Sequence, residues 1–175
     1  NQLIMGEAVP SERIINAKDK KVLVIGGGDT GSDCVGTSIR QGAVKVTQIE
    51  ILPQPPAGKN PATPWPYYPN ILKTSTSHEE GCDRKWCLNT KKFIGEKGKV
   101  TEVLVEEVAW EKDETGRFTM KPTGKTETIK ADLVFLALGF VHPVHEGLLT
   151  ELGVTFDGRG NVAIDANNKS NVAKV

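Results

Sequence analysis

Apolar and polar positions along the first third of the chain change their period twice. Residues 22–25 are four consecutive aliphatic residues, which is typical of a strand buried on both faces of a parallel sheet. Across 29–41 the apolar positions fall one helical turn apart and a glycine follows, which predicts a helix. Residues 44–52 return to a strand-like pattern. Residues 22–52 therefore predict a strand–helix–strand unit of about thirty residues, the usual size of a βαβ unit.

A proline-rich segment at 53–70 interrupts this pattern and holds seven of the ten prolines. Proline fixes φ and lacks a backbone donor, so the segment is predicted to be a long extended loop. Trp65, Tyr67 and Tyr68 lie within it. We expect these aromatic side chains to anchor the loop on the core, and direct contact with a ligand is the alternative.

Strand-like patterns resume after the loop. Between residues 85 and 130 apolar and polar residues alternate around a polar turn at 113–116, which predicts antiparallel strands with Trp86 and Trp110 as packing residues. Residues 131–139 form another apolar strand that ends in glycine. The expected fold class is therefore α/β, a Rossmann-like parallel sheet with a βαβ unit and an antiparallel β-meander.

Composition excludes two classes of partner. The chain has 22 basic and 22 acidic side chains among 175 residues, whereas a nucleic-acid-binding surface needs a basic excess. The longest apolar stretch, 133–141, is about half the length that spans a bilayer, so no membrane partner is expected either. The sequence begins without methionine and ends without a recognisable terminal signal, and we expect it to be part of a longer protein.

The cysteines and histidines bear on compartment and metal binding. Cys34, Cys82 and Cys87 are odd in number and form no CxxC pair, which predicts reduced thiols in a cytoplasmic protein. A zinc site would need more ligands at regular spacing, so no metal site is expected. His142 and His145 flank a proline and are expected to face solvent.

Four glycines lie at the junction of the first predicted strand and helix, in the stretch VLVIGGGDTGSDC. Gly26, Gly28 and Gly31 fit the spacing G-x-G-x-x-G in the strand-to-helix context that this motif requires. The first glycine permits the tight turn, the second lets the backbone approach a pyrophosphate, and the third lets the helix pack on the strand. The phosphates would meet the free N–H groups of the helix N-terminus. The βαβ unit is therefore predicted to bind a dinucleotide, and a tight turn that binds nothing is the alternative.

The other candidate site residues lie in this turn and at the ends of strands. Gly27 is part of the turn, and Asp29 and Thr30 fall at the helix N-terminus, where they can cap the helix or hydrogen-bond the ligand. Glu50 follows the last glycine of the motif by 19 residues and is the candidate acceptor for the adenine ribose, with a solvent-facing position as the alternative. Gly139 ends an apolar strand and can offer backbone contact to the cofactor.

Several longer segments resemble one family, the small (beta) subunits of the glutamate synthases. The similar segments include KKVLVIGGGDTGSDCVGTSIRQGA, IEILPQPP, NPATPWPYYP and ADLVFLALGF. The glycine motif and the last segment also resemble the wider two-dinucleotide flavoproteins, whereas the proline-rich segments are more specific. The resemblance covers nearly the whole chain and implies an NAD(P)H-binding domain inserted into an FAD-binding domain. Residues 1–20 would then be a linker from a missing FAD domain, 21–141 the NAD(P)H-binding domain, and 142–175 the return segment toward the FAD domain.

The same resemblance implies an electron path. NAD(P)H would reduce FAD, iron–sulfur clusters would carry the electrons to the large subunit, and glutamate would form there from 2-oxoglutarate and glutamine, as part of ammonia assimilation. The implied partners are the large subunit and the chain's own FAD domain. Because the cofactors supply the redox chemistry, no catalytic side chain is expected here. This chain alone is expected to be colourless and inactive.

The local residues and the resemblance favour different nicotinamide cofactors. Glu50 and Gly31 favour NADH, because a carboxylate at the ribose repels the 2′-phosphate of NADPH. The resemblance favours NADPH, and Lys59, Arg84 or Lys85 can supply the cation that a 2′-phosphate requires. We expect NADPH. Two other classes stay open: a non-redox Rossmann enzyme such as a methyltransferase, and a module that docks a partner subunit through the proline-rich loop.

Overall fold

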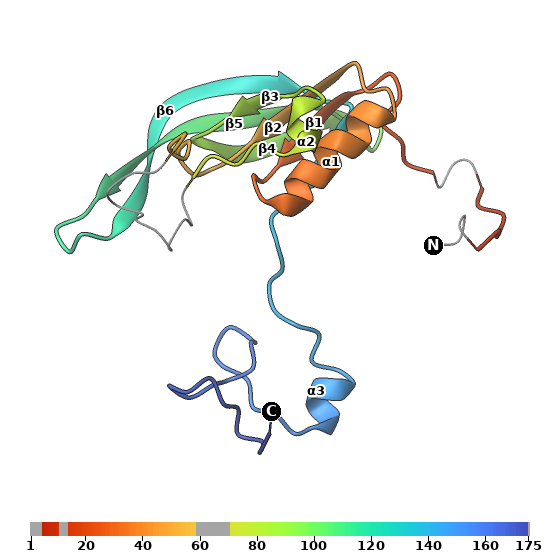
Figure 1. Cartoon of the computed structure of the whole chain (residues 1–175). Helices are drawn as coiled ribbons and strands as arrows, with labels where there is room; N and C mark the ends of the chain where they lie inside the picture. Colours follow the sequence, from red (N-terminus) through yellow and green to blue (C-terminus); the bar gives the residue numbers. More distant parts are fainter. Residues whose placement is uncertain (1–4, 11–13, 59–70, 175) are drawn as a thin grey trace. The chain divides into compact units, whose positions relative to one another are not determined.

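Two units make up the chain, and each is described by itself. The computed structural model describes residues 5–10, 14–58 and 71–174 (Figure 1). The first unit is Asn1–Leu138 and contains both sheets, and the second is Gly139–Val175. The glycine motif, the βαβ unit and the meander therefore all lie in the first unit.

A parallel sheet of four strands is the centre of the first unit, in the order β3-β2-β1-β7. β1 pairs in parallel with β2 on one side and with β7 on the other. Its aliphatic run is buried on both faces, as predicted, and the side chains of Leu23 and Val24 are wholly inaccessible. The elements of this layer are β1 (Lys21–Ile25), α1 (Asp29–Arg40), β2 (Lys45–Ile49), β3 (Asp83–Lys85) and β7 (Leu133–Leu136).

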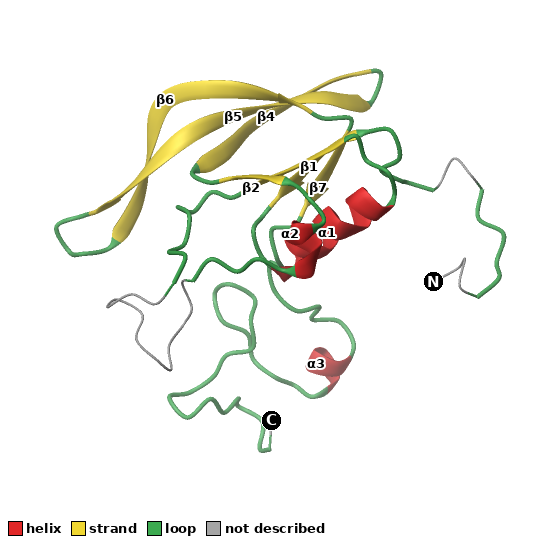
Figure 2. Cartoon of the chain, turned by 45° about the horizontal axis from the view of Figure 1, so that its top comes forward, coloured by secondary structure: helices red, strands yellow, loops and turns green. Residues whose placement is uncertain are grey.

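The antiparallel meander is the second sheet of this unit, in the order β4-β5-β6. Figure 2 shows its three strands beside the parallel sheet, with α1 on the other side. Its long central strand supplies buried valines to a core shared with β1 and β2. The strands are β4 (Leu88–Glu96), β5 (Lys99–Lys112) and β6 (Phe118–Lys130).

Alternation along β1 divides the core into two layers. Leu23 packs on the meander side with Val103 and Val105, whereas Val24 packs on the helix side with Val35 of α1. This arrangement holds the start of α1 against the carboxyl end of β1, where the glycine motif lies. The predicted fold class, a Rossmann-like parallel sheet with an antiparallel meander, is confirmed.

Three strands differ from the sequence prediction: one was not predicted, and two are shorter than expected. β3, at Asp83–Lys85, was not predicted because an edge strand of three charged residues has no apolar pattern. β2 ends at Ile49 rather than at residue 52, although the Glu50 N–H still donates to the Lys85 carbonyl at 2.9 Å. β7 keeps only the middle of the apolar segment 131–139. The early end of β2 places Glu50 at the carboxyl edge of the sheet.

The second unit has little regular structure. It contains the short helix α3 (Leu148–Glu151) and an antiparallel bridge between Phe156 and Val162. His145 is half-buried rather than solvent-facing, because its ring stacks on Phe156 at 3.9 Å between centroids and its Nε2 lies 2.6 Å from the Gly160 carbonyl oxygen. No helix in the described parts of the chain is long and apolar enough to cross a membrane.

Candidate functional site

Two glycines of the motif are explained by packing inside the chain. Gly26 has φ +122°, and a Cβ there would lie 2.1 Å from the carbonyl oxygen of Ala137, just beyond β7. A Cβ on Gly31 would lie 2.2 Å from the carbonyl oxygen of Gly26. Real Cβ atoms do not approach backbone oxygen so closely, so only glycine fits either position. These two residues shape the turn and bring α1 onto the sheet.

Gly28 has no such explanation within the chain. Its backbone is extended, with φ −80°, and no heavy atom of the described residues lies within 4 Å of where its Cβ would be. It is also the N-cap residue of α1, and no side chain caps the helix there, so neither Asp29 nor Thr30 has the capping role considered above. Free N–H groups beside an open glycine fit a phosphate group that approaches the backbone closely.

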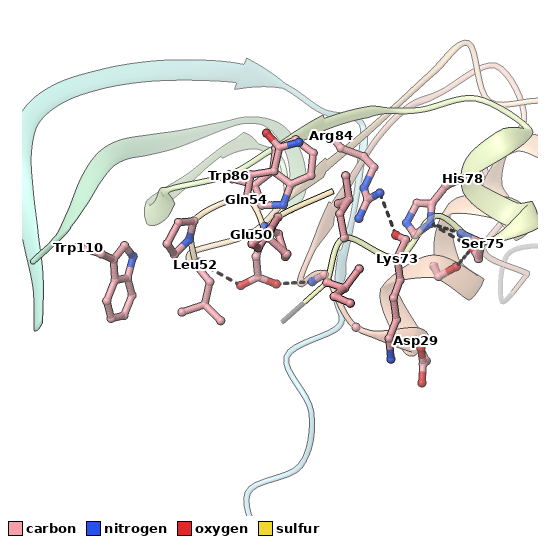
Figure 3. A pocket seen from close by; sticks show the side chains of 18 of the residues that line it. Asp29, Glu50, Leu52, Gln54, Lys73, Ser75, His78, Arg84, Trp86 and Trp110 are labelled. Carbon is pink, nitrogen blue, oxygen red and sulfur yellow. Dashed lines mark hydrogen bonds between the residues drawn. The ribbon is translucent and has the colours of Figure 1, made fainter. Parts of the chain in front are cut away.

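A cavity of about 640 Å³ opens beside this turn. Its wall includes Gly27, Gly28 and Asp29 at the start of α1, and Glu50 at the end of β2. It continues past the segment after β2 to aromatic side chains near and on the meander (Figure 3). The cavity lies wholly within the first unit and is large enough for a substantial part of a dinucleotide.

Glu50 joins the end of β2 to the glycine turn. Its Oε2 accepts from the Gly27 N–H at 2.5 Å, and its Oε1 accepts from Ile51 N at 2.9 Å and from Leu52 N at 3.3 Å. Three backbone donors therefore hold the carboxylate in one place at the cavity wall. A carboxylate has about four acceptor sites, so this one retains capacity for a hydroxyl group. The structure thus brings Glu50 to the glycine turn, and its predicted contact with a ribose stays a prediction.

A chain of polar side chains supports the turn from behind. Gln48, which is 2 % exposed, donates from Nε2 to the Gly26 carbonyl at 2.9 Å. Its Oε1 lies 2.9 Å from His78 Nε2, and His78 Nδ1 lies 3.2 Å from the backbone nitrogen of Ser75. Ser75 Oγ in turn contacts Ser32 Oγ of α1. The short helix α2 (Thr76–Glu79) begins in this network, which links it to the glycine turn.

The network requires a neutral His78. Its Nε2 must donate, because the amide oxygen of Gln48 only accepts, and its Nδ1 must accept, because the backbone N–H of Ser75 only donates. Burial, and to a lesser degree the Arg84 cation, lowers the pKa of His78 below its ordinary value. A second proton on Nδ1 would therefore break the bond from the Ser75 backbone N–H at the start of α2 and leave only the Ser75 hydroxyl, 3.0 Å away, as an acceptor for that proton.

We expect this histidine to make the stability of the fold depend on pH. Its pKa is lowered in the folded state, so the contribution of the neutral ring is complete above pH 6.5 and is lost as pH falls through the lowered value. Uptake of one proton limits the slope to about 1.4 kcal/mol per pH unit. Urea unfolding over this range should show a smaller decline in His78→Gln than in the wild type. The control is His142→Gln, which changes an exposed imidazole in the second unit and should keep the wild-type decline in the free energy of unfolding. A decline in His78→Gln equal to that of the wild type would contradict the role given to His78.

Two cations among the described residues lie at the cavity wall. Arg84 donates from one guanidinium nitrogen to the Lys73 carbonyl at 3.1 Å, and both side chains line the cavity. Lys85, by contrast, forms an ion pair with Glu127 at 2.7 Å outside this cavity. Lys59 and the loop aromatics Trp65, Tyr67 and Tyr68 fall outside the described residues. The sequence offered Lys59, Arg84 and Lys85 as cations for a 2′-phosphate. Of the two that the structure describes, Arg84 lines the cavity and Lys85 does not.

The residues at the cavity are not the same set as the residues predicted from the sequence. Gly139 belongs to the second unit, so its predicted contact with the cofactor stays a prediction. Gln48, Lys73 and His78 were not among the predicted site residues, because nothing in their spacing marks them. Trp86 and Trp110, expected to be packing residues, line the cavity.

The parallel sheet, the glycine turn and the uncapped helix start define a Rossmann-type fold with a candidate dinucleotide site. A thioredoxin reductase from T. acidophilum has the same fold, with a TM-score of 0.59, 23% identity, and coverage of 89% of this chain and 42% of that one. No family model matches the chain. Sequence comparison nevertheless shows that the chain is a homologue of part of the glutamate synthase small chains, which confirms the resemblance.

Three relatives illustrate this relationship. "Glutamate synthase [NADPH] small chain" of Mycobacterium tuberculosis is 50% identical over 149 residues, which cover 85% of this chain and 30% of that protein. The Bacillus subtilis protein of the same name is 36% identical, with 82% and 30% covered. "Glutamate synthase [NADH]" of Saccharomyces cerevisiae is 42% identical, with 71% and 6% covered. The chain thus spans about 30% of the length of the small chains that it matches.

Proposed function

We propose that this chain binds NAD(P)H and holds the cofactor for reduction of FAD in a glutamate synthase small subunit. The observation that carries the proposal is Gly28. A Cβ at this position would meet no atom of the described residues, and the glycine stands open to the cavity at an uncapped helix start. The names of the relatives, which specify NADPH in some cases and NADH in others, support a nicotinamide cofactor.

The residues of this chain would bind and orient the cofactor. The pyrophosphate would lie against the backbone of Gly28 and Asp29, where the helix N-terminus favours negative charge. Glu50 would accept from the hydroxyl groups of the adenine ribose, and Arg84 with Lys73 would attract phosphate. The nicotinamide supplies hydride when it is bound. None of these side chains acts as an acid, a base or a nucleophile in this scheme.

The role in the whole protein extends the proposal. Electrons from NAD(P)H would pass through FAD and iron–sulfur clusters to the large subunit, where glutamate is formed. An FAD domain and the large subunit would be the partners, and residues 142–175 would return toward the FAD domain. The three described cysteines are unpaired thiols, which fits a reducing compartment such as the cytoplasm.

Titration of the full chain with NADPH and NADH tests the proposal and the cofactor preference together. We expect wild-type protein to bind both and to prefer NADPH. Replacing Arg84 by glutamine should weaken NADPH by about tenfold, the equivalent of one charge-assisted hydrogen bond, and leave NADH nearly unchanged. Lys85→Gln is the matched control, because Lys85 pairs with Glu127 away from the cavity.

Glu50→Gln shows whether Arg84 or Glu50 determines the preference between NADPH and NADH. If Arg84 holds the 2′-phosphate, the ratio of the two affinities should change little in Glu50→Gln, whatever happens to each affinity. A wild-type preference for NADH that disappears in Glu50→Gln would show instead that the carboxylate selects the cofactor. Binding of S-adenosylmethionine in place of either dinucleotide would replace the proposed function by a non-redox enzyme.

A further inference from the structure

The end of the cavity away from the glycine turn is aromatic. Trp86 follows β3, Trp110 lies on β5 and Phe118 begins β6, and all three side chains line the cavity. Each retains access to solvent, and Phe118 is 60% exposed. Large aromatic side chains that remain partly open at the end of a cavity are suited to binding a flat ring.

Among the described aromatic side chains of the cavity, Trp110 has a ring that a hydrogen bond fixes and that no described cation covers. Its Nε1–H donates to the Ile51 carbonyl at 2.9 Å, which fixes the indole beside the segment that follows β2. The ring of Trp86 is covered by the Arg84 guanidinium at 5.2 Å, and that of Phe118 by the Lys112 ammonium at 5.3 Å. Among the described residues, no cation covers Trp110 in the same way.

A series of hydrogen bonds runs along the cavity wall from the Trp110 ring to the glycine turn. Trp110 bonds to the backbone of Ile51, the adjacent Leu52 N–H bonds to Glu50, and Glu50 bonds to the Gly27 N–H. In Figure 3 the labelled side chains follow the same order, with Glu50 between Trp110 and Asp29. An aromatic platform, a hydroxyl acceptor and a phosphate site thus follow one another along one wall.

We propose that Trp110 is the stacking platform for the adenine ring of the nicotinamide cofactor, with Leu52 packed beside it. The inference rests on the proposed function, because the pyrophosphate at Gly28 and the ribose at Glu50 set the direction of the adenosine half. The base then lies at Leu52 and Trp110, both of which line the cavity. Leu52 is 51% exposed, which leaves apolar surface for the edge of the base. Trp110 therefore determines recognition of the adenine and not the choice between NADH and NADPH.

Calorimetric titration of the full chain with NADPH, AMP and inorganic pyrophosphate tests this assignment. Loss of one base–aromatic stack should weaken AMP and NADPH by about tenfold in Trp110→Leu, and should leave pyrophosphate binding unchanged. Trp110→Phe keeps a stacking face without the bond to Ile51, so its affinities should stay within about threefold of wild type. Phe93→Leu is the control, because Phe93 is an aromatic residue of the meander that is 48% exposed and does not line the cavity.

Fluorescence gives a readout that does not depend on the stability of the leucine variant. AMP should quench the tryptophan emission of wild-type protein, and this quenching should be largely lost in Trp110→Phe although AMP still binds. Equal AMP affinity in wild type and Trp110→Leu, or an equal loss for AMP and pyrophosphate, would overturn the assignment while the proposed function stands. Wild-type protein that binds none of the three ligands would overturn the proposed function and this inference with it.

Discussion

Gly28→Val should weaken NADPH binding by at least about 100-fold, which is the equivalent of two charge-assisted hydrogen bonds between phosphate and backbone. The valine side chain would occupy the space over the start of α1 that no atom of the described residues fills. The backbone there is extended, a conformation that valine adopts without strain. The loss should therefore appear in binding, measured by calorimetry, while urea unfolding stays close to that of the wild type.

Gly158→Val is the matched control for this substitution. Gly158 also has open space around its Cβ position, but it is not among the residues that line the cavity. We expect its affinity for NADPH to equal that of the wild type. A folded Gly28→Val protein with wild-type affinity would show that the open glycine does not mark the ligand site.

Gly26→Ala should have the opposite effect and lower the free energy of unfolding on the order of 4 kcal/mol, from backbone strain combined with overpacking. The new Cβ would lie 2.1 Å from the oxygen and 2.8 Å from the carbon of the Ala137 carbonyl, and these are backbone atoms that cannot move aside as a flexible side chain can. The backbone at φ +122° is also one that side chains rarely permit. Urea unfolding of the variant measures the effect.

Gly28→Ala provides the control for stability in the same turn. Its Cβ meets nothing, and alanine at an N-cap position costs at most about 1 kcal/mol. A Gly26→Ala protein as stable as Gly28→Ala would mean that β7 does not hold the turn as described.

The sequence predicted those parts of the fold whose determinants are local. The aliphatic run at 22–25 and the helical spacing after it each specify their structure within a few residues, and both are confirmed. The glycine motif forms the turn between them, and its dinucleotide stays a prediction. β3 was missed because its three charged residues form a strand only through pairing with β2. Edge strands of this kind carry no signal of their own.

Much of the candidate site depends on contacts between distant segments, which no local pattern records. Trp110 reaches Ile51 across 59 residues, and His78 reaches Gln48 across 30. Trp110 was predicted to be a packing residue because apolar and polar residues alternate around it, and it does lie on a strand, β5. That strand is long enough, however, to bring the indole ring to the cavity. Spacing along the chain did place Glu50 near the end of the second strand, because a βαβ unit has a nearly fixed length, and its role at a ribose stays a prediction.

The position of β7 in the parallel sheet has a consequence for folding order. The central strand β1 is among the first elements of the chain, yet its second neighbour comes after the whole meander, and Lys21 N–H meets the Asp132 carboxylate 111 residues later. Contacts of such high contact order form slowly, because a long loop must close first. On the ribosome, one edge of β1 would stay unpaired until β7 had emerged. A nucleotide could therefore stabilise the nascent unit only near the end of its synthesis, once Ala137 had closed over Gly26.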